Sequence, residues 1–173
     1  MDLQQKKQNN FCFFLFYDRI FLGDSMKIGI ASDHRGYELK ESIIIKLEEK
    51  GYHMVDYGTH SNDSTDYPDY AFRLGENVRD KNVDFGVAIC GSGIGISIAC
   101  NKVKGIRCAK VDNLDEVVAT RRDNDSNIIA FGERTDIEDA LKWIETFVNT
   151  ETSQEEKHVR RRNKIKDYEE NAK

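Results

Sequence analysis

The chain has 173 residues, a formal net charge of −5 at pH 7 and 33% charged residues. This length suits one domain with a substantial core and is short for two. The acidic balance argues against a general nucleic-acid binder. Four cysteines without CxxC spacing, at positions 12, 90, 100 and 108, favour neither a zinc site nor a disulfide framework. We therefore expect reduced thiols, no metal and a cytoplasmic location.

The most apolar stretch is FCFFLFYDRIFL, at residues 11–22. Asp18 and Arg19 interrupt it after seven residues, whereas a membrane span needs about 20 apolar residues. No clean small-x-small cleavage site follows to mark a signal peptide. We interpret residues 1–25 as a disordered or weakly docked extension and Met26 as a candidate natural start.

From Met26 onward, short apolar runs alternate with stretches of helical spacing. The runs predict five strands, at about residues 26–32, 52–58, 83–90, 105–111 and 127–132. Helices are expected over about residues 36–51, 68–81, 94–102, 113–122 and 137–148. Parallel strands that are covered on both faces are apolar almost throughout, as GVAIC and NIIAF are. The pattern predicts a doubly wound, Rossmann-like α/β domain over residues 26–150, with a parallel sheet of order 2-1-3-4-5.

The remaining residues, 151–173, are highly charged and carry no broad apolar stripe. Such a segment is typical of a helix that faces solvent or a partner. We expect a charged C-terminal helix after the α/β domain.

The strand order predicts where a ligand should bind. In open parallel sheets the site lies beyond the carboxyl ends of the strands where the order reverses, here between the first and third strands. Those ends carry SDHRG and CGSGIG, so Asp33 and His34 should face Cys90 and its glycines. A glycine loop before a helix can bind an anion through backbone N–H groups. Alternatively, Asp33 caps the next helix, His34 is an exposed loop residue and Cys90 is a small buried hydrophobe.

A nucleotide-binding module is the second interpretation of the glycine loop. In GSGIGI the last glycine comes one position too early for G-x-G-x-x-G, and Ile96 stands where helix packing needs a small residue. The loop also follows the third strand rather than the first. Asp112, at the end of the next strand, could nevertheless bind a ribose, which keeps this alternative open.

Four segments, SDHRGYELK, DYGTHSNDSTDYPDYA, ICGSGIGISIACNKVKGIRCA and NDSNIIAFGER, closely resemble the ribose-5-phosphate isomerase B family. That family includes isomerases of galactose 6-phosphate and allose 6-phosphate, and the resemblance covers about residues 26–161. It implies a five-stranded parallel domain that works as a homodimer or tetramer with active sites shared between subunits. It also implies interconversion of ribose 5-phosphate and ribulose 5-phosphate in the non-oxidative pentose phosphate pathway, without cofactor, nucleic acid or membrane.

The implied reaction moves a proton between C2 and C1 through a cis-enediolate, which requires a base, an oxyanion cradle and a phosphate clamp. Cys90 matches the family's base, and Ser92 takes the place of a hydroxyl residue beside it. The enediolate oxygens would be held by Gly91, Gly93, Ile94 and Gly95. The other substrate-binding positions that match the family are Asp33, His34, Tyr67, Asn124, Arg134, Lys157 and Arg161.

Some of these positions also have simpler interpretations. Lys157 and Arg161 lie four residues apart on one helical face, as a phosphate clamp needs, but HVRRRNK could instead be a solvated basic face or a nucleic-acid patch. Lys157 stands where the family usually has an arginine, and a lysine lacks the bidentate fork. Tyr67 could simply be a packed aromatic.

Asp123 is the most important departure from the family pattern, because it stands where the family has its ring-opening histidine. An aspartate can accept a proton from the C1 hydroxyl, but as a donor it is handicapped unless burial raises its pKa. We therefore expect slow ring opening, or reliance on open-chain substrate. Family members specialised for hexose phosphates also lack this histidine, so a hexose 6-phosphate is the alternative substrate.

Overall fold

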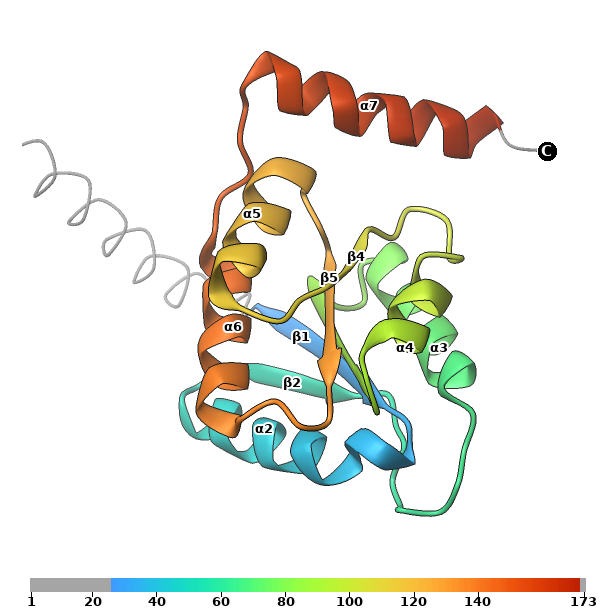
Figure 1. Cartoon of the computed structure of the whole chain (residues 1–173), viewed down its shortest axis with the longest axis vertical. Coiled ribbons are helices and arrows are strands. Elements are labelled where there is room, and N and C mark those ends of the chain that lie inside the picture. The colour runs from blue at the N-terminus through green and yellow to red at the C-terminus, as the bar shows by residue number, and fades with distance from the viewer. Residues whose placement is uncertain (1–25, 172–173) are drawn as a thin grey trace, which may run out of the picture.

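The structure is a computed structural model that describes residues 26–171, a five-stranded parallel sheet with helices on both faces (Figure 1). Its strands are β1 (Lys27–Ser32), β2 (His53–Asp56), β3 (Phe85–Cys90), β4 (Cys108–Lys110) and β5 (Ile128–Gly132). Its helices are η1 (His34–Gly36), α2 (Tyr37–Glu49), α3 (Tyr67–Arg79), α4 (Ile94–Cys100), α5 (Leu114–Asn124), α6 (Ile137–Asn149) and α7 (Glu156–Asn171). The doubly wound α/β class is confirmed. The expectations for residues 1–25 lie outside the described residues.

The strand order is β2-β1-β3-β5-β4, so the predicted order 2-1-3-4-5 is wrong at the last two strands. β5 pairs with β3 as far as Cys90 and Gly132. The stretch from Ile128 to Phe131 is fully buried, as suits a central strand covered on both faces. β4 has three half-buried residues including Lys110, which suits an edge. The reversal point is unchanged, because β1 still lies between β2 and β3.

The sheet separates two apolar layers. Ile129 and Phe131 of β5 pack into the layer formed with α2, α5 and α6, where Phe131 meets Trp143 edge-to-face at 5.8 Å between ring centroids. Ile128 and Ala130 point the opposite way, toward α3 and α4. This alternation fixes β5 between two helix layers and holds the strand ends that carry the candidate site.

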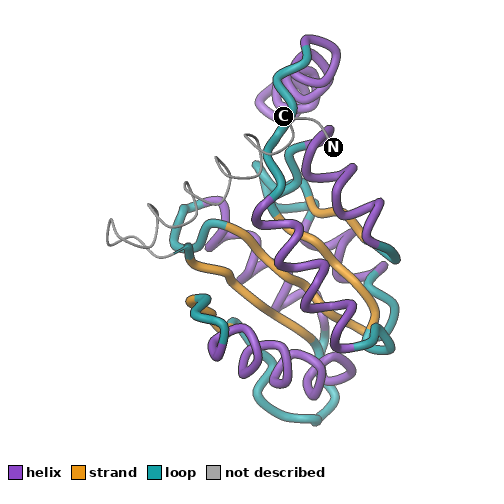
Figure 2. The backbone as a smooth tube through the Cα atoms, turned by 90° about the vertical axis from the view of Figure 1, so that its left-hand side faces the viewer, coloured by secondary structure: helices purple, strands orange, loops and turns teal. Residues whose placement is uncertain are grey.

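The charged tail does form a helix, α7, and it packs against α5. Figures 1 and 2 both place α7 outside the body of the α/β layers. His158 is its buried residue, whereas Ile165 and Tyr168 are exposed. None of the helices between residues 26 and 171 is long and apolar enough to cross a membrane.

Candidate active site

The ends of β1 and β3 meet as the strand order predicts. Asp33 follows β1 directly, and its backbone N–H donates to the carbonyl of Ile89 in β3 at 3.2 Å. Asp33 and Cys90 are therefore neighbours at the carboxyl edge of the sheet. Both are nearly enclosed, with 6% and 4% of their surface exposed.

Cys90 is hydrogen-bonded by its own glycine loop. The backbone N–H of Gly93 donates to Cys90 Sγ at 3.2 Å, so the sulfur serves as an acceptor where the loop turns into α4. Ser92 is exposed, and its hydroxyl accepts from Ile94 N–H at 3.3 Å rather than contacting the sulfur. The loop thus places a backbone donor against the Cys90 sulfur and leaves Ser92 exposed.

Two of the loop's glycines are required by close packing. Gly93 has φ +77°, and a Cβ there would lie 2.8 Å from the backbone of Phe131. A Cβ on Gly95 would lie 2.7 Å from the ring of Tyr67. Tyr67 is therefore a packed aromatic against the first turn of α4, and it is also partly exposed beside the loop.

The segment after β1 is held by local and long-range hydrogen bonds. The Asp33 carboxylate accepts from the N–H groups of Arg35 at 2.9 Å and Gly36 at 3.3 Å, so its capping role is confirmed. His34 Nδ1 accepts from Thr65 N–H at 3.2 Å. In this neutral tautomer Nε2 carries the hydrogen, which gives His34 a donor for a substrate.

Lys40 is a residue of this region that the sequence analysis missed. Its ammonium is fully buried and lies 2.5 Å from Asp56 Oδ2. The other oxygen of Asp56 accepts from Gly58 N–H at 2.8 Å, which fixes the start of the loop that ends at Thr65. The helical pattern alone could not show this burial, because the partner lies on another element.

The end of β5 brings cationic groups to the same edge. Glu133 N–H donates to the carbonyl of Cys90 at 2.9 Å, and the Glu133 carboxylate forms an ion pair with Arg35. The hydrogen bond and charge of Arg35, with a smaller effect from Arg134, hold the pKa of Glu133 below its ordinary value. Arg134 is exposed. His34 and Arg134 thus lie on the same edge of the sheet as Cys90.

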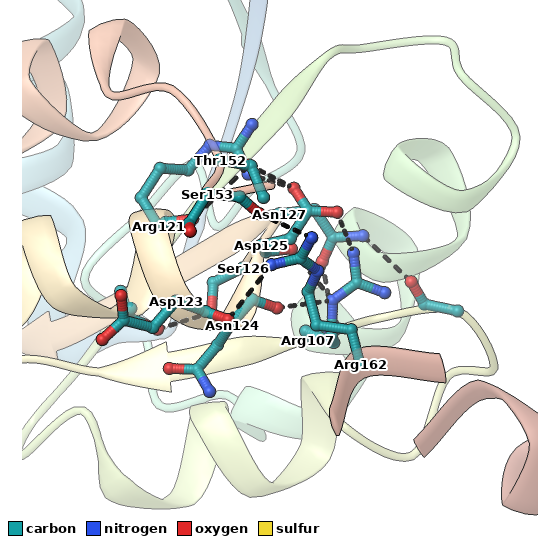
Figure 3. Close-up of polar contacts among 12 residues, drawn as sticks. Arg107, Arg121, Asp123, Asn124, Asp125, Ser126, Asn127, Thr152, Ser153 and Arg162 are labelled. Atoms are coloured by element: carbon teal, nitrogen blue, oxygen red, sulfur yellow. Dashed lines mark hydrogen bonds and ion pairs between the residues drawn. The ribbon is translucent and has the colours of Figure 1, made fainter. Parts of the chain in front are cut away.

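Four other predicted site residues lie elsewhere: Asp123, Asn124, Lys157 and Arg161. Asp123 and Asn124 end α5 at the amino edge of the sheet, where Arg107 donates to the carbonyl of Asn124 at 3.1 Å (Figure 3). β5 has five residues, so this edge lies ~13 Å along the sheet from the Cys90 edge. Within one chain, the structure therefore does not bring Asp123 and Cys90 together.

The contacts of Asp123 favour its ionised carboxylate over the protonated carboxylic acid. Arg122 donates to both of its oxygens, at 2.7 and 3.2 Å. That hydrogen bonding, with the charges of Arg122, His158 and Lys157, lowers the pKa of Asp123. Burial acts in the opposite direction but is outweighed, so the handicap expected for Asp123 as a proton donor is present. His158, which the sequence analysis did not single out, faces this carboxylate from α7, with Nε2 3.8 Å from Oδ1.

The nucleotide-binding alternative requires Asp112 near the glycine loop, and the structure places it elsewhere. β5 lies between β3 and β4, so a whole strand separates Asp112 from the glycine loop, and Asp112 forms an ion pair with Lys110. No group of three or more His, Cys, Asp or Glu in the described part of the chain is arranged to hold a metal ion.

Comparisons with known proteins agree with this fold. The family model described as Ribose/Galactose Isomerase matches residues 28–165. The chain is 44% identical over 108 residues to ribose-5-phosphate isomerase B of Escherichia coli, covering 62% of this chain and 72% of that protein. Ribose-5-phosphate isomerase B of Clostridium thermocellum has a TM-score of 0.80 at 45% identity, with 84% of this chain and 98% of that chain covered. The Mycoplasma genitalium enzyme, solved with bound ribulose-5-phosphate, has a TM-score of 0.79 at 33% identity, with 86% and 99% covered.

Proposed function

Because the chain belongs to the ribose/galactose isomerase family, as a sugar-phosphate isomerase of the ribose-5-phosphate isomerase B type, we propose that it interconverts ribose 5-phosphate and ribulose 5-phosphate with Cys90 as the base. The observation that carries this proposal is the position of the Cys90 sulfur. It lies at the reversal point of the sheet, beside Asp33, and accepts from Gly93 N–H at 3.2 Å. The Mycoplasma genitalium relative with bound ribulose-5-phosphate supports the choice of a pentose phosphate.

The proposed chemistry begins with open-chain ribose 5-phosphate. The Cys90 thiolate removes the C2 proton, the electron pair forms a C1–C2 double bond, and negative charge develops on O1. N–H groups between Gly91 and Gly95 stabilise that charge, and one such donor is typically worth about 3 kcal/mol. The Ser92 hydroxyl adds a further donor. Transfer of a proton from O2 to O1, and of the Cys90 proton to C1, then leaves the C2 ketone.

The phosphate clamp combines both edges of the sheet, and we therefore infer a homodimer with shared sites. His34 and Arg134 lie at the Cys90 edge, whereas Lys157 and Arg161 are exposed on α7. One chain cannot join them, because the edges are ~13 Å apart. The α7 helix of a second copy can bring these cationic side chains to the Cys90 edge of the first. Exposed Ile94 and Ile98 on α4, which follows the Cys90 loop, offer apolar surface for such a contact.

Conversion of ribose 5-phosphate by the purified protein, without added metal or nucleotide, tests the activity. Cys90→Ala should lose at least about 10²-fold in kcat, the usual contribution of a positioned base. Cys108→Ala is the matched control, because it removes a thiol on β4, which β5 separates from β3 and Cys90, and it should retain activity. If Cys90→Ala retains activity as the control does, the role of Cys90 as the base is contradicted.

A mixture of two defective chains tests the shared site. Co-expressed Cys90→Ala and Arg161→Ala chains should recover about a quarter of the wild-type activity, because half of the dimers then contain one intact site. No recovery, or a monomer by analytical ultracentrifugation, would contradict sharing.

A hexose 6-phosphate remains the second candidate substrate, and Asp123 is the observation that favours it. The carboxylate that replaces the histidine is held ionised by Arg122, so that position has no donor for opening a pentose ring. Activity on allose 6-phosphate or galactose 6-phosphate, with none on ribose 5-phosphate, would replace the pentose assignment.

A further inference from the structure

Resting on the proposed function, we propose that His158, held against Asp123, is the proton donor that opens the sugar ring in this chain. The pair then performs with two residues, from α5 and α7, the step that the family pattern gives to one histidine at position 123. Neither the family resemblance nor the comparisons assign this role to His158.

The first support is the position of His158. Its Nε2 lies 3.8 Å from Asp123 Oδ1 and 4.0 Å from Glu155 Oε2. These distances are longer than a hydrogen bond, so Nε2 can still donate to a substrate oxygen that approaches it from beside the two carboxylates. His158 is only 9% exposed, whereas most of the remaining side chains of α7 face solvent.

The second support is the anchoring of α7 at this point. Arg162, one turn after His158, donates to the carbonyl of Asp123 at 3.3 Å and to the carbonyl of Ser153 at 2.9 Å (Figure 3). Ser153 N–H in turn donates to the carbonyl of Arg122 at 2.8 Å. These bonds hold the start of α7 against the end of α5, which keeps the imidazole beside the carboxylate.

The third support is that the two groups have complementary proton chemistry. Hydrogen bonds from Arg122 lower the pKa of Asp123, so near neutral pH this residue is a carboxylate that can only accept. An imidazole is the side chain whose ordinary titration range allows it to donate near neutrality. A pair of one acceptor and one donor is what ring opening requires.

The step balances without a further reactant. Protonated His158 gives its Nε2 proton to the ring oxygen as the bond from C1 to that oxygen breaks, and the bonding electrons go to the ring oxygen. The C1 hydroxyl gives its proton to the Asp123 carboxylate, and C1 becomes the aldehyde carbon. The proton then passes from Asp123 to His158, which restores both groups for the next turnover.

The test separates ring opening from isomerisation. Ribulose 5-phosphate cannot form a five-membered ring because its C5 oxygen carries the phosphate, so exchange of its C1 proton in D₂O needs enediolate formation only. His158→Gln should leave this exchange, followed by NMR, within about twofold of wild type while slowing conversion of ribose 5-phosphate by about 10²-fold. Arg160→Gln is the matched control on the exposed face of α7, where it pairs with Glu156, and it should change neither rate.

Rescue provides a second, independent readout. Asp123→His in the His158→Gln background returns an imidazole to the pair, and it should restore most of the lost conversion. Equal loss of exchange and conversion in His158→Gln, without rescue, would show a structural role and overturn the proposal, as would unchanged conversion. Wild-type protein that performs neither reaction would instead overturn the proposed function, and the role of His158 with it.

Discussion

Arg35 and Glu133, which are 98 residues apart in the chain, are joined by two hydrogen bonds across the carboxyl edge of the sheet. Arg35 Nε donates to Glu133 Oε2 at 2.9 Å, and Arg35 Nη2 donates to Oε1. The partners adjoin His34 and Arg134, the two phosphate-binding candidates at this edge. The ion pair therefore sets the spacing between the segments after β1 and β5.

Glu133→Gln should weaken substrate binding more than catalysis. Loss of the paired geometry lets His34 and Arg134 move apart, so we expect KM for the sugar phosphate to rise roughly three- to tenfold with kcat within about twofold. Because Arg35 lowers the pKa of Glu133, the effect should be constant from about pH 5 to 9. Steady-state kinetics measure it. Glu138→Gln, which removes an exposed partner of Lys46, is the control, and a change mainly in kcat would contradict the prediction.

Gly93→Ala should lower the free energy of unfolding by more than the backbone strain of a positive φ alone explains. Gly93 and Gly105 have similar φ angles, +77° and +83°, but only at Gly93 would the new Cβ meet backbone, at 2.8 Å from Phe131. Gly105→Ala should lower the free energy of unfolding by about 1 kcal/mol from backbone strain. Gly93→Ala should lower it further and also lower kcat, because the N–H that donates to Cys90 moves. Urea denaturation and kinetics of both variants measure this, and equal effects would contradict it.

The elements of the fold were predictable because each depends on a local pattern. Apolar runs such as GVAIC and the spacing within α6 identify strands and helices without knowledge of their neighbours. The order of β4 and β5 is a long-range property, and the prediction failed there. The relevant signal was composition: NIIAF has no charged residue, whereas CAK ends in Lys110.

The candidate site was likewise predictable only where it follows from the order of the strands. Asp33 and Cys90 meet because the position of the reversal depends only on the connections around β1. The contact of His158 with Asp123 could not be predicted, because it depends on how Arg162 docks α7 onto main-chain carbonyls. Likewise, the burial of Lys40 depends on Asp56 in another element.

Cys108 should be an unreactive thiol. The neighbouring Cys100 thiol, together with burial, raises the pKa of Cys108 well above its ordinary value, so it stays protonated at pH 8. We expect alkylation by iodoacetamide to be at least about tenfold slower in native protein than in urea. Peptide mass spectrometry measures it. Cys100→Ala should speed the native reaction, and a native rate equal to the rate in urea would contradict the prediction.

Asp125 joins the end of α5 to the segment before α7. Its carboxylate pairs with Arg107 at 2.8 Å and with Arg121, and it accepts from the Thr152 hydroxyl at 2.9 Å (Figure 3). Burial alone would raise the pKa of Asp125, but the hydrogen bonds from Arg121 and Thr152 and the charges of both arginines outweigh it and lower the pKa. The carboxylate therefore stabilises the junction that positions Asn124 and α7.

Asp125→Asn should consequently weaken folding in a pH-dependent way. Between the lowered folded pKa and the unfolded value near 3.9, the unfolded chain binds more protons, so stability from this group is present above about pH 4 and is lost on acidification. The side chain is 37% exposed, and with screening by water we expect a loss of about 1 kcal/mol at pH 7 that shrinks toward pH 2. Urea denaturation at several pH values and one protein concentration measures it. Asp80→Asn, which removes an exposed partner of Arg79, is the control, and a variant with the wild-type acid profile would show that Asp125 does not carry this stabilisation.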